Sequence, residues 1–280
     1  GDITADITEV VGYRIPTEAE WEYAARGAEN DKNTPTDYLY GGSNNLGEVG
    51  WYKGNRPDYG PQQIGQKLPN EIGLYDISGN VREYCHDWYG VYPNTKQVNP
   101  IGASNASGKR VERSGSWINI AYNCRIANRG LQNPDVGCNA LGFRLAKTGE
   151  ISTTPTVLEE VRINSGIFQI GDTFGTGFSN EIPVHTVNLT KDYYIGKYEV
   201  THAQFVDFLN DKEVEFNNDD GEIDGRRIIH INNRVASGIG FSGTNWFVKT
   251  EYNGHSLSYS QMPVVNVTWW GAVEFCNWLN

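Results

Sequence analysis

The sequence predicts a loop-rich α+β fold with an aromatic core. Three observations lead to this class. Aromatic residues make up 12% of the 280 residues, and glycine occurs 32 times. Short apolar runs with the period of two of a strand recur along the chain, whereas the 3.6-residue period of a helix is confined to a few stretches. A chain of this length can bury a sizeable core, as one large domain or two small ones.

The first part of the chain begins with a predicted helix. Thr17 is a good N-cap, Glu20 three residues later completes a capping box, and Gly27 ends the helix. Residues 28–70 are dense in Asn, Asp, Gly and Pro and predict loops. Strands are expected at 83–89 (EYCHDWY), 110–117 (RVERSGSW) and 142–147 (GFRLAK).

Residues 149–160 (GEISTTPTVLEE) are expected to form a linker, after which the pattern starts again. Residues 161–172 alternate like a strand, and the longer alternating run at 184–201 predicts a strand or a hairpin. Two further helices are expected, one after the N-cap Thr201 and one after the N-cap Thr268.

Charge and motifs exclude several classes of function. The net charge of −11 and the pI near 4.9 argue against a nucleic-acid partner, because an acidic surface repels phosphates. No apolar run reaches 18 residues, so no membrane span is expected. There is no GxSxG, P-loop or Rossmann glycine pattern, and the five histidines have no metal-ligand spacing. No CxxC pair occurs, and we expect most of the cysteines to be buried free thiols.

The stretch at 113–147, RSGSWINIAYNCRIANRGLQNPDVGCNALGFRLAK, has an unusual organisation. Regular-looking pieces (GSW, NCR, ANR, NPD, LGFRLA) alternate with inserts that follow neither the strand nor the helix period. A rigid frame with unpatterned inserts suggests a scaffold that presents a variable surface. The frame arginines Arg125, Arg129 and Arg144 are expected to hydrogen-bond loop carbonyls.

Five motifs together resemble the formylglycine-generating-enzyme (sulfatase-modifying-factor) family: YRIPTEAEWEYAARG, GLYDISGNVREYCHDWYG, the 113–147 frame, FQIGD to FVDFLN, and MPVVNVTWWGAVEFCNWLN. The resemblance covers nearly all of the chain apart from the linker and parts of 211–250. It implies a C-type-lectin-like α+β fold with two main helices and small antiparallel sheets.

The order of the motifs is reversed relative to that family, since 1–148 corresponds to its second half and 161–280 to its first. The chain could be a circular permutant joined through 149–160, it could span two tandem copies, or the numbering could conceal a break. We favour a single closed domain over 1–280, because half of such a fold could not bury its aromatic residues alone. A permutant would bring Gly1 and Asn280 close together.

The resemblance bears on catalysis through one position. Family enzymes use two cysteines five residues apart, and here Cys124 corresponds to the second while Asn119 stands in place of the first. We therefore expect no enzyme activity of this type and no copper site. The alternative is a formylglycine-generating-type oxidase or another enzyme of the family.

Within the family, the frame is similar to that of the variable proteins of diversity-generating retroelements, in which adenine-directed mutation rewrites Asn codons. The resemblance implies a non-enzymatic protein that binds a protein or cell-surface ligand and is surface-displayed or virion-associated. Most of the inserts are reachable from an AAC codon by changing its adenines, but Gln132 is not. Exposed together, the apolar inserts would form a patch of the kind that marks interaction sites. The candidate ligand-binding residues are Trp117, Ile118, Ile120, Tyr122, Ile126, Gly130, Leu131, Gln132, Val136, Gly137, Cys138 and Ala140.

A structural calcium ion is a further expectation. The sequence GNVRE resembles the family's calcium loop, which assigns ligand oxygens to the Asn80 side chain, the Val81 carbonyl and Glu83. Oxygen ligands of this kind suit calcium.

Overall fold

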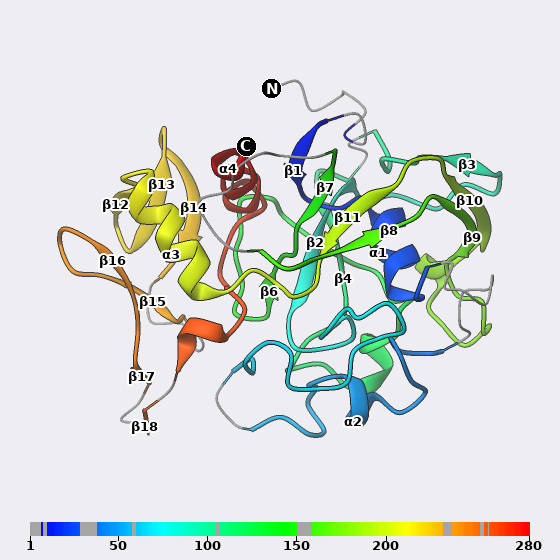
Figure 1. The fold of residues 1–280 in the computed structure, drawn as a ribbon, viewed down its shortest axis with the longest axis horizontal. Helices are drawn as coiled ribbons and strands as arrows, with labels where there is room; N and C mark the ends of the chain where they lie inside the picture. The colour runs from blue at the N-terminus through cyan, green and yellow to red at the C-terminus, as the bar shows by residue number, and fades with distance from the viewer. Residues whose placement is uncertain are drawn as a thin grey trace.

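The computed structural model describes residue 7 and residues 10–28, 38–57, 60–104, 107–149, 158–231, 237–252, 255–256 and 258–280 (Figure 1). The predicted α+β class is confirmed: small sheets and loops surround a few helices. The predicted linker at 149–160 falls largely outside the described residues.

The helices begin where the sequence places their caps. In α1, the Thr17 side chain accepts from the Glu20 N–H and the Glu20 carboxylate accepts from the Thr17 N–H, so the predicted capping box is confirmed. Thr201 and Thr268 cap α3 and α4 in the predicted way. The α-helices of the described residues are α1 (Glu18–Ala25), α2 (Leu46–Val49), α3 (His202–Asp211) and α4 (Trp269–Leu279), with 3-10 turns η2 (Ala121–Cys124), η3 (Ser179–Glu181) and η4 (Tyr259–Gln261).

The strands are short, and each of the predicted strand segments overlaps at least one of them. In the first part they are β1 (Gly12–Arg14), β2 (Arg82–Trp88), β3 (Gln97–Val98), β4 (Arg110–Arg113), β5 (Gly130–Gln132), β6 (Leu141–Gly142) and β7 (Ala146–Thr148). In the second part they are β8 (Glu160–Ile163), β9 (Gly166–Ile170), β10 (His185–Leu189), β11 (Tyr193–Gly196), β12 (Glu215–Asn217), β13 (Asp220–Ile223), β14 (Arg226–His230), β15 (Ile239–Phe241), β16 (Trp246–Val248), β17 (Glu251–Tyr252) and β18 (His255–Ser256).

Two of the sheets combine strands from both parts of the chain. The central sheet has the order β1-β7-β11-β8, and a second sheet has the order β3-β10-β9. The alternating run at 184–201 is not a hairpin, because β10 pairs with β3 and β9 while β11 pairs with β7 and β8. A third sheet, β5-β4-β2-β6, carries the 113–147 stretch.

The end of α4 lies beside β1 (Figure 1). The Asn280 side chain accepts from the Tyr13 N–H at 2.6 Å and donates to the Tyr13 carbonyl at 2.9 Å. Gly12 has a φ of +116°, and a Cβ there would lie 2.2 Å from Asn280 Oδ1. Gly1, which a permutant would bring close to Asn280, lies outside the described residues.

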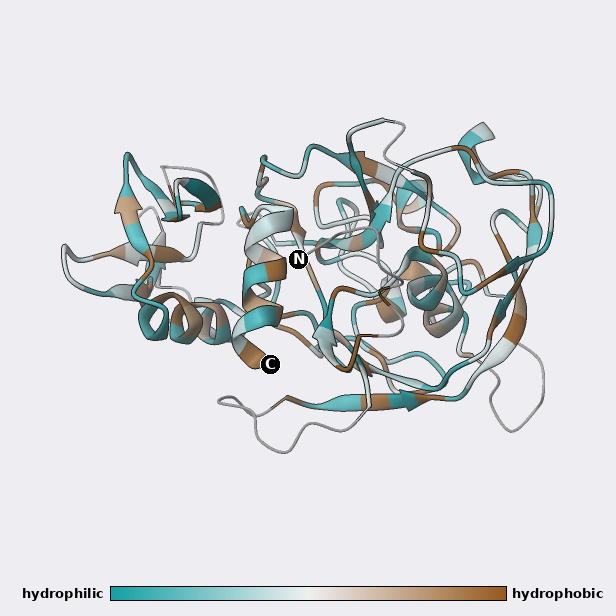
Figure 2. Ribbon diagram, turned by 90° about the horizontal axis from the view of Figure 1, so that it is seen from above, coloured by the Kyte–Doolittle hydropathy of each residue, from teal (hydrophilic) through white to brown (hydrophobic). Residues whose placement is uncertain are grey.

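The larger hydrophobic core is also shared between the two parts. It packs Phe143 and Leu145 of the first part against Phe205 and Phe275 of the helices α3 and α4. A second core surrounds α1 and the strands β9, β10 and β11. Apolar and polar bands alternate along α4 in Figure 2, as expected for a helix that buries one face.

The thiol prediction is confirmed, since Cys85, Cys124 and Cys276 are buried free cysteines and Cys138 is half-buried. Among the described residues, none of the helices combines the length and the apolar character that a membrane crossing requires.

Candidate functional site

The 113–147 stretch runs from the end of β4 through η2, β5 and β6 into β7. Most of its frame residues are buried, but Asn133 and Asp135 of the NPD piece are exposed. Gly115 has a φ of +71°, and a Cβ there would lie 2.6 Å from the Asn123 carbonyl oxygen, so glycine is required for this turn. Cys124 is fully buried next to it. Burial raises the pKa of the Cys124 thiol to about 12, which disfavours the reactive thiolate.

The frame arginines hydrogen-bond loop carbonyls, as predicted. Arg125 donates to the Tyr122 carbonyl, and Arg144 donates to the carbonyls of Tyr75 and Gly196. Arg129 donates to the carbonyls of Gly90 and Asn180.

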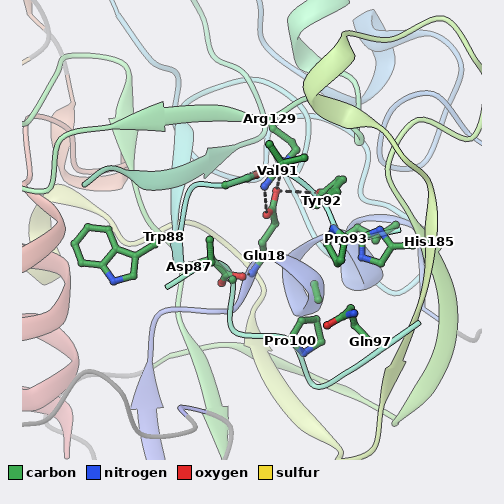
Figure 3. A pocket seen from close by; sticks show the side chains of 15 residues that line it. Glu18, Asp87, Trp88, Val91, Tyr92, Pro93, Gln97, Pro100, Arg129 and His185 are labelled. Atoms are coloured by element: carbon green, nitrogen blue, oxygen red, sulfur yellow. Dashed lines mark hydrogen bonds and ion pairs between the residues drawn. The ribbon is translucent and has the colours of Figure 1, made fainter. Parts of the chain in front are cut away.

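Each of these arginines also has a carboxylate partner that the sequence did not reveal. Arg125 forms two hydrogen bonds to Glu181, of 2.7 and 2.8 Å, and Arg144 forms two to Glu83, both of 2.7 Å. Arg129 does the same with Glu18 (Figure 3). Bidentate pairs of this kind fix the guanidinium plane and thereby the loop that carries it.

Several of the inserts are exposed on this frame. Ile120 is 56% exposed, Ile118 41%, and Leu131 and Val136 are each 39% exposed. Tyr122 is half-buried, and its hydroxyl donates to the Thr176 carbonyl at 2.6 Å. We call these five residues the binding face, after the role that the sequence predicts for them.

For four of the candidate residues the expected exposure is wrong. Trp117 packs against Val81 and Val265 and donates from Nε1 to the Asn139 carbonyl, and Ala140 belongs to the same cluster. Ile126 lies in the core around α1, and a Cβ at Gly137 would lie 2.0 Å from the Asn266 carbonyl oxygen. These positions shape the frame from within. The remaining candidates Gly130, Gln132 and Cys138 are half-buried.

A loop that the sequence analysis did not single out completes the binding face. The Phe178 ring meets the Tyr122 ring edge-on, with centroids 4.8 Å apart, and is 43% exposed. The two Asp172 carboxylate oxygens accept from the N–H groups of Phe174 and Gly177, which holds this loop in shape. Aromatic residues between glycines in TFGTGF, with no regular period, were the available signal.

A recess of about 380 Å³ opens between Phe178 and the 113–147 stretch. We call it the Gly130 recess, after the residue at its wall. Its lining includes Arg82, Glu112, Asn123, Gly130, Phe178 and Asn180.

A second cavity, of about 280 Å³, lies around Glu18 (Figure 3). Its lining includes Asp87, Tyr92, Arg129 and His185. The Glu18 carboxylate accepts from Arg129 and from the Tyr92 hydroxyl, while Asp87 accepts from the Glu18 N–H at 2.8 Å. Burial raises the pKa of Asp87 to about 8, with a further contribution from the negative charge of Glu18.

The residues predicted to bind calcium do not fit that ion as they are arranged. Both Glu83 oxygens accept from Arg144, and one also accepts from Trp21 Nε1. The Asn80 side chain exchanges hydrogen bonds with the Gln62 backbone. In the part of the chain that the structure describes, no three His, Cys, Asp or Glu residues are grouped to hold a metal ion.

Asn119, which the resemblance predicts to replace the first family cysteine, makes two side-chain contacts. Its Oδ1 accepts from Ser116 Oγ at 2.6 Å and from Arg82 Nε at 3.2 Å. The amide thus links the start of the 113–147 stretch to β2.

Comparisons with known proteins identify similar chains. The Sulfatase-modifying factor enzyme 1-like domain family matches residues 3–149 and residues 147–280. The chaperone protein LppX of Paenibacillus barcinonensis is 36% identical over 135 residues, which cover 42% of this chain and 43% of that protein. The formylglycine-generating enzyme of Mus musculus is 36% identical over 154 residues, which cover 48% of this chain and 39% of the enzyme.

Among solved structures, Treponema denticola variable protein 1 is 37% identical over 49% of this chain and 48% of that chain, with a TM-score of 0.45. The chain spans less than half the length of the curated relatives that it matches.

Proposed function

Because the chain belongs to the family of Sulfatase-modifying factor enzyme 1-like domains, we propose that it uses that fold to hold a ligand-binding face and is not an enzyme. One observation carries the proposal. Along 113–147 the frame arginines Arg125 and Arg144 are buried and ion-paired, whereas the apolar side chains of Ile118 and Ile120 are exposed to solvent. Exposed apolar groups on a rigid support are characteristic of interaction surfaces.

The same pattern supports the interpretation of this chain as a variable protein of a diversity-generating retroelement. In such a protein the inserts change and the frame stays constant, so the changing side chains must lie outside the core. The side chains of Ile118, Ile120, Leu131 and Val136 meet that condition, whereas Ile126 and Ala140 do not, because they are buried. The ligand would be a protein or a cell-surface component, and the protein would be surface-displayed or virion-associated.

The alternative function is a formylglycine-generating-type oxidase. It is disfavoured because Asn119 stands where the first cysteine is expected, and because the Cys124 thiol is buried with a raised pKa. Copper-dependent turnover of a sulfatase peptide by the purified protein would overturn the binding proposal in favour of this enzyme.

A displayed library tests the binding proposal directly. Positions 118, 120, 122, 131 and 136 are randomised, and the library is selected on immobilised streptavidin as a defined target. We expect folded members to be common and binders to be enriched. A matched library randomised at positions 124–126 should display poorly, because it disrupts the buried frame. If both libraries fold equally badly, or if the first yields no binders, the binding face is refuted.

Genomic context offers an independent check. We expect a reverse-transcriptase gene near the coding sequence, together with a near-copy of the codons for 113–147.

A further inference from the structure

The loop at 171–184 presents apolar side chains beside the binding face. Its large hydrophobic residues that are between 37% and 49% exposed are Phe174, Phe178, Ile182 and Val184. The Phe178 ring meets the Tyr122 ring edge-on and also lines the Gly130 recess. Open space therefore adjoins a ring that already contacts the binding face.

Hydrogen bonds hold this loop against the 113–147 stretch. Asn180 Nδ2 donates to the Arg129 carbonyl at 3.1 Å, and Arg129 Nη1 donates to the Asn180 carbonyl at 3.0 Å. Asn128 Nδ2 donates to Glu181 Oε1 at 3.2 Å. A loop that is already anchored loses little conformational freedom when a ligand binds, so its apolar contacts contribute to affinity at a low entropic cost.

The two segments that form this surface expose no charge, although the whole chain has a net charge of −11. Both segments, 117–131 and 171–184, are described throughout, and their charged residues are at most 6% exposed: Arg125, Arg129, Asp172 and Glu181. The centres of protein–protein interfaces are depleted of charged residues and enriched in aromatic ones. The surface therefore suits an uncharged apolar patch on a protein ligand.

Phe178 differs from its neighbour Tyr122 in one respect. Tyr122 is one of the candidate variable positions, which all lie between 117 and 140, whereas Phe178 lies in the other part of the chain. A substitution at 122 changes the residue beside Phe178 but leaves the Phe178 ring itself in place. The ring is thus available whatever residues occupy the variable positions.

We propose that Phe178 is a constant aromatic anchor of the binding face, which packs against an uncharged apolar patch of the protein ligand. The variable residues of 113–147 select among ligands, and Phe178 contributes affinity for all of them. This inference rests on the proposed binding function.

Binders from the displayed library test the proposal. Several independent streptavidin binders receive Phe178→Ser, and their dissociation constants are measured by surface plasmon resonance. We expect most of them to weaken by at least about tenfold, whatever their residues at the randomised positions, because truncation of an aromatic anchor has an effect of this size.

Phe247→Ser is the matched control. Phe247 is 44% exposed and Phe178 is 43% exposed, but β16, which carries Phe247, lies at the opposite end of the molecule from β9 and β10 (Figure 1). The control should change the dissociation constants by less than about twofold, as expected for a surface substitution away from the interface.

Hydroxyl-radical footprinting of the unsubstituted binders keeps the test decisive if Phe178→Ser does not fold. The oxidation rate of the Phe178 ring should fall when streptavidin is bound, because the ligand covers the ring. The oxidation rate of Phe247 should stay the same.

Two results would overturn the inference: binders that keep their affinity after Phe178→Ser, or a Phe178 oxidation rate that bound streptavidin does not lower. Either result leaves the binders themselves in hand and so refutes only the anchor. A library that yields no binders refutes the binding face itself.

Discussion

Arg125 and Glu181 form a buried two-point ion pair that joins the end of η2, in the 113–147 stretch, to η3, the 3-10 turn that precedes β10. Their side chains are at most 2% exposed, and the guanidinium also lies over the Tyr122 ring at 4.2 Å. The pair therefore positions Tyr122 and Phe178 together, although the two aromatic residues are far apart in the sequence. A binding face assembled in this way depends on an interaction beneath it.

Glu181→Gln should destabilise the protein strongly, because it leaves the Arg125 guanidinium buried without its counter-charge. The expected loss in the free energy of unfolding is about 3–5 kcal/mol, measured by urea denaturation. Asp192→Asn, in the exposed pair with Arg162, serves as the control and should change the stability by less than about 1 kcal/mol. Equal effects of the two substitutions would show that Arg125 is solvated.

Substitutions at the binding face should be tolerated. Ile118→Ser and Ile120→Ser should each change the free energy of unfolding by no more than about 0.5 kcal/mol, because these side chains are exposed in the folded protein. Ile126→Ala, from the same stretch, should cost about 2–5 kcal/mol, because the residue is 2% exposed in the core. Urea denaturation of the three variants measures the contrast. A large loss at Ile118 or Ile120 would mean that the inserts support the fold.

Local features of the fold were predictable from the sequence. Thr17, Thr201 and Thr268 placed three helix starts correctly, since a capping side chain acts within its own turn. The alternation at 184–201 did not show whether this run forms one strand or a hairpin, because distant segments determine the partners of each strand. In the structure, β10 and β11 join different sheets.

The candidate site was predictable only in part. Ile118 and Ile120 were correctly expected to be exposed, but Ile126 and Trp117 have the same apolar character and are buried. Pattern alone does not separate them, since their environment is set by Val265 and α1 from distant parts of the chain. The place of Phe178 beside the binding face was not predicted, for the same reason.

The stability of the protein should depend on pH through Asp87. Its pKa is raised from 3.8 to about 8 in the folded state, so between these values the folded chain holds a proton that the unfolded chain has released. This contribution is fully present below about pH 4 and is lost as the pH rises through 8. Asp87→Asn should therefore gain stability relative to the wild type with rising pH over this window, measured by urea denaturation at several pH values. A constant difference between the two proteins would show that Asp87 titrates normally.

The two parts of the chain should depend on each other for folding. In the central sheet, β1 and β7 come from the first part, β11 and β8 come from the second, and β7 pairs with β11. Trp269 Nε1 also donates to the Cys85 carbonyl across the shared core. Residues 1–149 and 158–280, co-expressed as separate polypeptides, should therefore copurify as one complex and unfold in one transition. Each polypeptide alone should be unfolded or aggregated, because its half of the aromatic core is uncovered. Size-exclusion chromatography and circular dichroism measure both outcomes. Two polypeptides that elute separately, each folded, would contradict the single closed domain over 1–280 and favour two independent units.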